Sequence, residues 1–217
     1  MKTEQQHFDK AAATWDEMPL RVKLAEDVAT AIIRQVAIAP DMTALDFGCG
    51  TGLLTLQLQP LVQSITGVDS SQGMLDIFNA KIASANIDNV GTLFLDSDQG
   101  GTLTGTYDLI VSGMTLHHIR DIAPLLAQFY TVLAPGGTLA LADLDREDGQ
   151  FHDDSTGVFH HGFDRASLHR SFMDAGFVDV EDVTAANIEK PGRDGATRTF
   201  PVFLLTGRKK VLPMVKA

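Results

Sequence analysis

The feature that most constrains the fold of this chain is a run of three closely spaced glycines directly after a short apolar segment. Residues 43–47 are mostly apolar and lead into Gly48, Gly50 and Gly52, after which a helical pattern begins. Glycine permits a tight turn and lets a ligand approach the backbone closely, but each glycine costs conformational entropy on folding. The pattern therefore predicts a strand–loop–helix unit whose loop holds a ligand, in preference to a purely structural turn.

Further apolar runs alternate with helical patterns along the chain. Strands are expected at residues 43–47, 64–68, 90–95, 107–112, 138–142, 178–183 and 200–206. Helices are expected within residues 5–36, divided in two at Pro19 because proline breaks a helix interior, and at residues 53–61, 72–85, 121–133 and 165–175, with a turn at residues 135–137. Short apolar strands separated by helices are typical of parallel sheets that helices cover on both faces. The sequence therefore predicts an α/β fold with a mostly parallel, seven-stranded sheet, whose ligands bind at the carboxyl ends of the strands.

The spacing of the glycines narrows the choice of ligand. A dinucleotide fingerprint reads G-x-G-x-x-G, whereas here the glycines read G-x-G-x-G and Leu53 stands at the position of the third glycine. Asp46 lies two residues before Gly48. A carboxylate there would repel a pyrophosphate and would suit a ligand with an ammonium group. S-adenosylmethionine (SAM) carries both an ammonium and a sulfonium.

Residues 44–52 resemble motif I of the class I SAM-dependent methyltransferases, in the broad group that includes the ubiquinone and menaquinone C-methyltransferases. Four further segments resemble that family's other motifs in the expected order, at residues 67–75, 95–97, 107–112 and 133–139. The resemblance implies a single Rossmann-like domain that transfers a methyl group from SAM to a small-molecule acceptor by in-line displacement. It also implies a division of residues 1–217 into a helical N-terminal lid (1–40), a cofactor-binding core (41–145) and a substrate-side segment with the last strands (146–207).

The resemblance places the cofactor in the loops that follow the strands. Asp69, at the end of the second strand, is expected to accept hydrogen bonds from both ribose hydroxyls, and Asp96, or Asp98 after a shift of register, to accept one from the adenine amine. The candidate cofactor-binding residues are Asp46, Gly48, Cys49, Gly50, Asp69, Ser70, Met74, Asp96, Ser97 and Ser112. Structural alternatives stay open, since Asp69 and Ser70 can cap the next helix and Met74 can be a core residue.

Two histidine pairs are candidates for contact with the methyl acceptor. His117 and His118 follow the fourth strand, near the expected position of the methyl group, and either can accept a proton because histidine has an intrinsic pKa near 6.5. His160 and His161 follow the fifth strand and, with Trp15 of the N-terminal segment, are candidate substrate contacts. The alternatives are that the first pair packs the next helix and that the second lies in a polar loop. A general base is needed only for an acceptor that carries a proton of high pKa, because positioning alone supplies much of the catalysis.

Composition and charge limit the partners. The net charge is −11, whereas nucleic-acid-binding proteins usually carry a basic stripe, so no nucleic-acid substrate is expected. No apolar run approaches the roughly 18 residues of a membrane span, and the N-terminus lacks the apolar core of a signal peptide. The single cysteine excludes a disulfide within the chain. Together, these three features predict no membrane association and a cytoplasmic location. No metal is expected, because the histidines and carboxylates of residues 151–164 match no familiar zinc spacing.

Two other functions compete with methyl transfer. An NAD(P)-dependent oxidoreductase would use a similar sheet, but Leu53 in place of the third glycine and the carboxylate of Asp46 argue against it. A non-catalytic SAM-binding protein would share every cofactor contact. The intact acidic residues Asp46, Asp69 and Asp96 argue against a degenerate cofactor site, which favours the methyltransferase.

Overall fold

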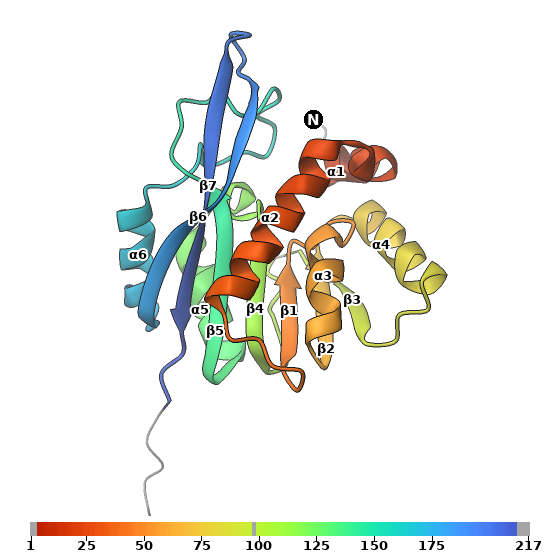
Figure 1. The fold of residues 1–217 in the computed structure, drawn as a ribbon, viewed down its shortest axis with the longest axis vertical. Coiled ribbons are helices and arrows are strands. Elements are labelled where there is room, and N and C mark those ends of the chain that lie inside the picture. Colours follow the sequence, from red (N-terminus) through yellow and green to blue (C-terminus); the bar gives the residue numbers. More distant parts are fainter. Residues whose placement is uncertain (1–3, 97–98, 212–217) are drawn as a thin grey trace, which may run out of the picture.

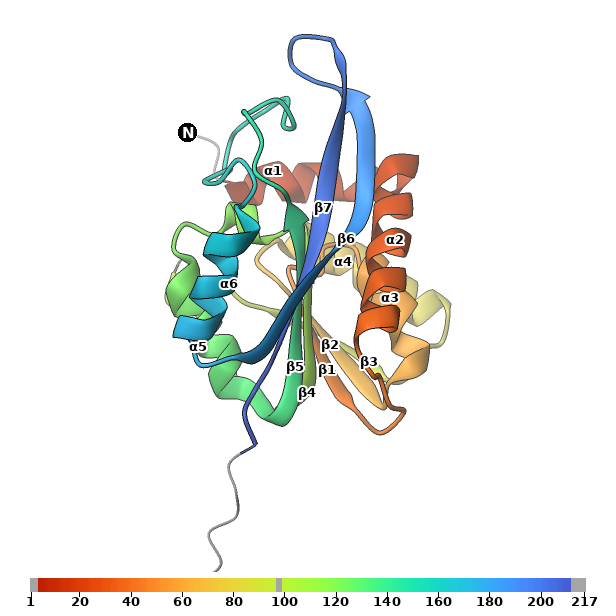
Figure 2. The same cartoon turned by 60° about the vertical axis from the view of Figure 1, so that its left-hand side comes forward.

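The computed structural model describes residues 4–96 and 99–211, which form one seven-stranded sheet with helices on both faces (Figures 1 and 2). The strands are β1 (Thr43–Phe47), β2 (Ser64–Asp69), β3 (Val90–Phe94), β4 (Tyr107–Gly113), β5 (Leu133–Leu144), β6 (Val178–Pro191) and β7 (Thr197–Arg208). Their order is β3-β2-β1-β4-β5-β7-β6. Strand β7 runs antiparallel to both of its neighbours, and the other pairs are parallel. This architecture confirms the predicted α/β fold with a mostly parallel sheet.

The two faces of the sheet bury different sets of apolar side chains. The helices are α1 (Glu4–Ala11), α2 (Pro19–Gln35), α3 (Leu53–Leu58), α4 (Gln72–Ser84), α5 (Ile122–Val132) and α6 (Arg165–Asp174), with short 3₁₀ turns η1 (Ala12–Glu17), η2 (Gln59–Leu61) and η3 (Leu116–His118). Ala44 packs in the cluster that α2 and α3 cover, and Leu45 in the one that α5 and α6 cover. Successive strand residues point to opposite faces, so apolar residues at both positions require helices on both sides. Figure 2 shows the two helical layers.

The ends of the helices follow ordinary capping rules. Proline fixes its own φ and lacks an N–H, so it suits the first turn of a helix. Pro19 begins α2, as predicted, and separates it from the preceding α1 and η1. The Ser71 hydroxyl accepts a hydrogen bond from the Met74 N–H and caps α4, and the Asp164 carboxylate caps α6 through Ser167. The cap of α4 is therefore Ser71, and Asp69 is left for another role.

The last strands are longer than the sequence pattern predicts. Strands β6 and β7 extend as a hairpin well past the end of their neighbours, at the top of Figure 1. Strand β5 already begins at Leu133, and the expected turn at residues 135–137 is instead a bulge inside it. The register with β4 jumps from Tyr107↔Leu133 to Leu109↔Thr138 at this point. Gly136 and Gly137 exchange backbone hydrogen bonds with Lys209 beyond β7, so the bulge is held in the sheet.

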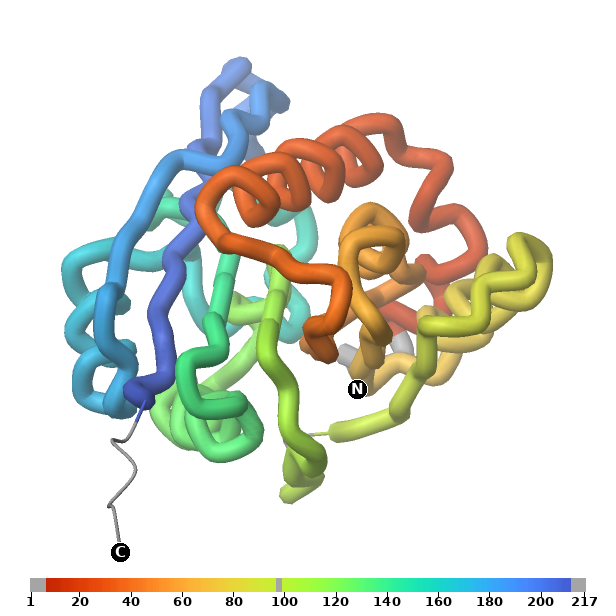
Figure 3. Tube along the Cα trace, turned by 60° about the horizontal axis from the view of Figure 1, so that its bottom comes forward, coloured from red at the N-terminus to blue at the C-terminus, as the bar shows by residue number. Residues whose placement is uncertain are grey.

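The N-terminal segment, comprising α1 and η1, lies across the carboxyl edge of the sheet and beside α4. Contacts between α1 and α4 and between η1 and α4 place these elements side by side, and the path of the chain can be followed in Figure 3. None of the helices in the described ranges is long and apolar enough to cross a membrane.

Candidate functional site

The glycine loop after β1 faces both a neighbouring loop and open space. Gly48 and Gly50 have φ angles of +73° and +52°, a region that residues with a side chain rarely adopt. A Cβ atom on Gly48 would lie 2.2 Å from Thr115 Oγ1, so glycine here lets the loops after β1 and β4 approach each other. A Cβ atom on Gly50 would meet nothing within 4 Å. The loop therefore leaves room for a ligand above Gly50.

Asp69, at the carboxyl end of β2, ties the two neighbouring loops together. One carboxylate oxygen accepts a hydrogen bond from the Gly50 N–H at 2.8 Å, and the other accepts one from the Ser71 N–H at 2.8 Å. Burial raises the pKa of Asp69, and hydrogen bonds from backbone N–H groups only partly offset this rise. Asp69 thus holds the glycine loop and the start of α4 around one partly desolvated carboxylate.

Asp46, inside β1, adds a second carboxylate beneath the loop. Its side chain is about 1% exposed and accepts a hydrogen bond from the Thr55 hydroxyl at 2.6 Å. The pKa of Asp46 is raised to about 7, chiefly by burial and also by the nearby charge of Asp69, while the hydrogen bonds from Thr55 act in the opposite direction. A nearby cation favours the charged form of a buried carboxylate. Together Asp46 and Asp69 therefore favour a ligand that carries positive charge.

The other predicted cofactor residues take varied positions. Met74 is about 1% exposed and Cys49 about 7%, so both side chains are packed in the protein, as the core alternative for Met74 requires. The buried Ser112 hydroxyl donates to the Phe47 carbonyl at 2.7 Å, which leaves its backbone as the available contact. Asp96 accepts two hydrogen bonds from Gln99. Half-buried Ser70 follows Asp69, whereas Ser97 and Asp98 lie outside the described residues.

His117 forms a buried pair with Asp143 at the end of β5. His117 Nδ1 lies 2.7 Å from Asp143 Oδ1, and the two side chains are 2% and 0% exposed. The carboxylate also accepts hydrogen bonds from the backbone N–H groups of His117 and Leu144. Burial by itself raises the pKa of Asp143, but the charge and hydrogen bonds of His117 and the Leu144 N–H outweigh it, so the pKa is lowered. A carboxylate only accepts. Nδ1 of His117 therefore carries the hydrogen, and Nε2 is the nitrogen that can take a proton.

Two further imidazoles gather on this pair. The ring centroid of His117 lies 4.2 Å from that of His118 and 4.8 Å from that of His152. His118 Nδ1 donates to the Gly157 carbonyl at 2.9 Å, which fixes its ring against the segment that follows β5. Burial lowers the pKa of His152 to about 3, and the charges of His117 and His118 act in the same direction. The His152 ring therefore stays neutral at physiological pH.

The sequence pattern did not single out Asp143, and it grouped His152 only with the other histidines and carboxylates of residues 151–164. Asp143 is one polar residue in an otherwise apolar strand end, Leu139 to Leu144, and that interruption was the available signal. His152 Nε2 is buried and has no hydrogen-bond partner among the described residues. This atom can therefore accept a hydrogen bond from a molecule held beside the cluster.

The second predicted histidine pair does not join this cluster. His160 Nε2 donates to the Ile119 carbonyl at 2.9 Å, so that nitrogen is used to hold the loop. His161 is largely exposed, and its Nδ1 lies 3.6 Å from Glu147 Oε1. The described residues contain no group of three or more histidine, cysteine or acidic side chains placed to hold a metal.

Phe8 brings the N-terminal segment against the histidine cluster, and Trp15 packs beside Phe8. The centroid of the Phe8 ring lies 5.1 Å from that of His118 and 5.8 Å from that of Trp15, both in edge-to-face contact. The Arg21 guanidinium carbon lies 3.6 Å from the Trp15 ring centroid. Arg21 is therefore the cation that stacks on Trp15, and the aromatic contact that the segment makes to the histidine cluster comes from Phe8.

Comparison with known proteins identifies relatives of the same architecture. An uncharacterised methyltransferase from Schizosaccharomyces pombe is 34% identical over 160 residues, which cover 67% of this chain and 56% of that protein. A demethylmenaquinone methyltransferase from Symbiobacterium thermophilum is 28% identical over 66% of this chain and 60% of its own length. The chain thus spans less than two thirds of the length of these curated relatives.

Solved structures with the same fold include a phosphoethanolamine N-methyltransferase of Haemonchus contortus, in complex with S-adenosyl-L-methionine. It has a TM-score of 0.68 and 17% identity over 84% of this chain and 52% of that chain. The sequence model for the methyltransferase domain matches residues 20–182, which span the sheet from before β1 into β6. The resemblance read from the sequence motifs is confirmed, and the chain belongs to the methyltransferase-domain family.

Proposed function

We propose that this protein transfers a methyl group from SAM to a small-molecule acceptor, at the carboxyl edge of the sheet. When bound, SAM supplies an electrophilic methyl group on a positively charged sulfur. The observation that carries the proposal is the pair of desolvated carboxylates, Asp46 and Asp69, below a glycine loop that faces open space at Gly50. Membership of the methyltransferase-domain family supports it.

Local geometry supports the proposed cofactor contacts of Asp69 and Asp46. Asp69 already accepts hydrogen bonds from Gly50 and Ser71. Carboxylate oxygens offer about four lone-pair sites, so Asp69 can also accept from the ribose hydroxyls. The side chain of Asp46 is buried, so it does not contact the cofactor directly. Its negative charge attracts the cationic end of the cofactor from beneath the loop. Asp96, after β3, is the proposed partner of the adenine amine.

The three-histidine cluster is the proposed acceptor side of the site. An acceptor whose proton has a high pKa must lose that proton when the methyl group is attached, and a general base of the chain then takes it up. His117 can hold it on Nε2, because Asp143 fixes the hydrogen on Nδ1. His118 lines the same cluster, beneath Phe8 of the N-terminal segment. The division into lid (1–40), cofactor core (41–145) and substrate side (146–207) belongs to this proposal.

The alternative functions differ in which ligand the glycine loop binds and in whether the protein catalyses a reaction. An oxidoreductase is disfavoured by the position of Leu53 and by family membership. The relatives described above are named for different acceptors, a menaquinone precursor and phosphoethanolamine. We therefore propose a small molecule without naming it. The net charge of −11 argues against nucleic acid, and a cytoplasmic location stays a prediction.

Calorimetric titration with S-adenosylhomocysteine tests the cofactor site directly. The wild type should bind it with micromolar affinity, and Asp69→Asn should weaken binding at least tenfold, because an amide cannot accept from two backbone N–H groups and two hydroxyls. Asp76→Asn is the matched control, since Asp76 is an exposed aspartate on α4 and should bind like the wild type. A folded wild type that binds NADPH but not S-adenosylhomocysteine would refute the proposal. Labelled SAM with candidate acceptors then separates an enzyme from a SAM-binding protein.

A further inference from the structure

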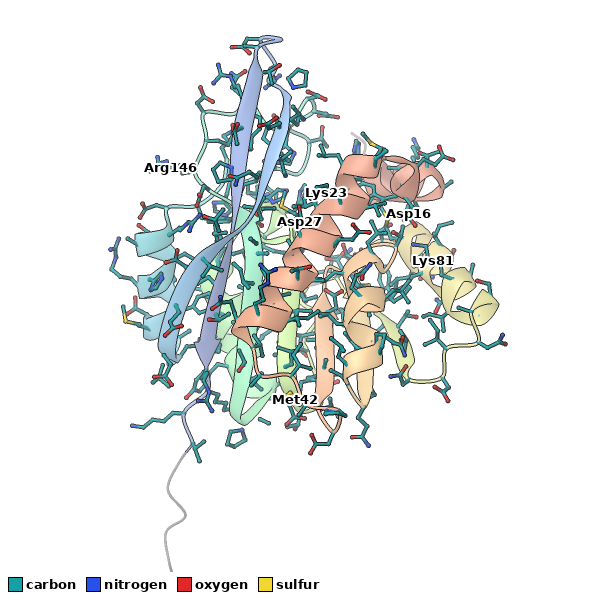
Figure 4. All side chains as sticks on the ribbon, in the orientation of Figure 1. Asp16, Lys23, Asp27, Met42, Lys81 and Arg146 are labelled. Atoms are coloured by element: carbon teal, nitrogen blue, oxygen red, sulfur yellow. The ribbon has the colours of Figure 1, made fainter. Side chains whose placement is uncertain are left out.

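The N-terminal segment is fastened to the glycine loop by a compact polar network. Asp16 of η1 accepts a hydrogen bond from the Thr51 hydroxyl at 2.6 Å and forms an ion pair with Lys81 of α4. Lys81 Nζ also donates to the Thr51 carbonyl at 2.7 Å. The network therefore closes on itself and joins three elements: the N-terminal segment, the glycine loop and α4. Figure 4 shows Asp16 and Lys81 facing each other where η1 meets α4.

This network satisfies both polar groups that Thr51 presents to the N-terminal segment. Thr51 is about 1% exposed, so an unpaired hydroxyl or carbonyl there would cost free energy. Asp16 pairs with the hydroxyl and Lys81 with the carbonyl. The side chains of Lys81 and Asp16 themselves remain 28% and 31% exposed. Water can therefore reach the charges and replace their contacts, so the network can open without breaking the core.

A second anchor fixes the same segment to the other cofactor loop. Asp9 of α1 accepts hydrogen bonds from the Ser71 hydroxyl at 2.6 Å and from the Gly73 N–H at 2.9 Å. Ser71 is the cap of α4, and its backbone N–H also donates to Asp69. Phe8, next to Asp9, meets His118 on the far side of the site. The segment thus spans the loops after β1, β2 and β4.

We propose that Asp16 and Lys81 form a latch that holds the N-terminal segment closed over the bound cofactor, so that its release requires this latch to open. A ligand that contacts both Gly50 and Asp69 would lie beside a segment that is tied to the loops after β1 and β2. Asp16 and Lys81 are positioning residues in this scheme, because they act through Thr51 and do not touch the cofactor. The inference rests on the proposed cofactor site and adds a control over exchange.

The chain carries its own reporter for the movement. Trp15 is the single tryptophan of the sequence and directly precedes Asp16. Stopped-flow fluorescence with increasing S-adenosylhomocysteine gives the dissociation rate constant from the intercept of the observed rate. Lys81→Met and Asp16→Asn should each raise this constant about tenfold, equivalent to about 1.4 kcal/mol. The double variant should match the single variants, because either change alone already opens the latch.

Lys23→Met is the matched control. It removes an exposed lysine–aspartate pair within α2, Lys23 with Asp27, that does not join the segment to the core (Figure 4). Its dissociation rate constant should equal that of the wild type. Dissociation within twofold of wild type in both latch variants, or effects that simply add in the double variant, would overturn the latch. So would binding seen by calorimetry without a change in Trp15 fluorescence. Absence of calorimetric binding by the wild type would instead refute the cofactor site itself.

Discussion

Replacing Asp143 by leucine should destabilise the protein more than replacing Asp143 and His117 together. The single change leaves three buried donors without an acceptor: His117 Nδ1–H and the backbone N–H groups of His117 and Leu144. Removing one partner of a buried charged pair costs about 3–5 kcal/mol. Since Asp143 is fully buried, exposure does not reduce this cost, and we expect the free energy of unfolding to fall by an amount in that range.

The double variant Asp143→Leu/His117→Phe removes the imidazole donor as well and fills a similar volume with an apolar ring. Its free energy of unfolding should exceed that of the single variant by about 1–3 kcal/mol, the cost of one buried donor without a partner, because the Nδ1–H group is no longer present. It should not reach wild-type stability, because the two backbone N–H groups still lack an acceptor. The order of stability is therefore wild type, double variant, single variant.

Urea unfolding at 25 °C, followed by circular dichroism at neutral pH, measures the three free energies. Asp88→Ala, at an exposed aspartate, is the control and should change stability little. The lowered pKa of Asp143 means that its stabilising effect is present above the unfolded pKa, about 3.9. That effect is lost as the pH falls through the folded value, so the difference from Asp143→Leu should shrink only below about pH 4. A loss under about 1 kcal/mol in the single variant, or a double variant no more stable than the single, would refute the reasoning.

Three further substitutions test the glycine loop and the carboxylate of Asp46. The pKa of Asp46 is raised to about 7 in the folded protein. Its protonated carboxyl therefore contributes fully to the free energy of unfolding below the pKa of the unfolded chain, and this contribution is lost as the pH rises through the pKa of the folded protein. Asp46→Asn should therefore flatten the decline in unfolding temperature between about pH 4 and pH 8, and an unchanged slope would count against a buried, protonatable Asp46. Gly50→Ala should cost about 1–2 kcal/mol, the strain of a left-handed backbone, and should weaken S-adenosylhomocysteine binding because its methyl group enters the open space. Gly48→Ala should cost more in urea unfolding, since its methyl group also overlaps Thr115; equal costs for the two variants would contradict this account.

The parts of the fold that the sequence predicted are those set by local chemistry. The strand, glycine loop and helix at residues 43–58 follow from backbone freedom and apolar periodicity, and Pro19 divides the N-terminal helices because proline lacks an N–H. The extent of β6 and β7 follows instead from pairing with each other over residues 186–202, where polar residues alternate beyond the core. The bulge at residues 135–137 also depends on a distant partner, Lys209, which no local pattern indicates.

The candidate site divides in the same way. Asp46 and the three glycines lie within residues 44–52, and Asp69 lies within residues 67–75. Each of these segments is continuous in the chain, so its resemblance to a family motif is enough to predict these residues as candidates. Asp143 and His152 acquire their roles only when the loops after β4 and β5 fold against each other. The aspartates of the N-terminal segment were visible as the repeated aromatic–aspartate pairs Phe8-Asp9 and Trp15-Asp16. Their partners, Thr51 and Ser71, lie 35 and 62 residues away in the chain.

The N-terminal segment connects the two halves of the site. Its aspartates bind the loops after β1 and β2, which form the proposed cofactor site, while Phe8 rests on His118 in the histidine cluster. A segment tied to both cannot leave one without disturbing the other. Opening of the Asp16–Lys81 latch would therefore also uncover the His118 ring, and an acceptor that packs against Phe8 would in turn hold the latch closed. Binding free energies are reciprocal, so the acceptor should slow cofactor release by the same coupling with which the cofactor strengthens acceptor binding.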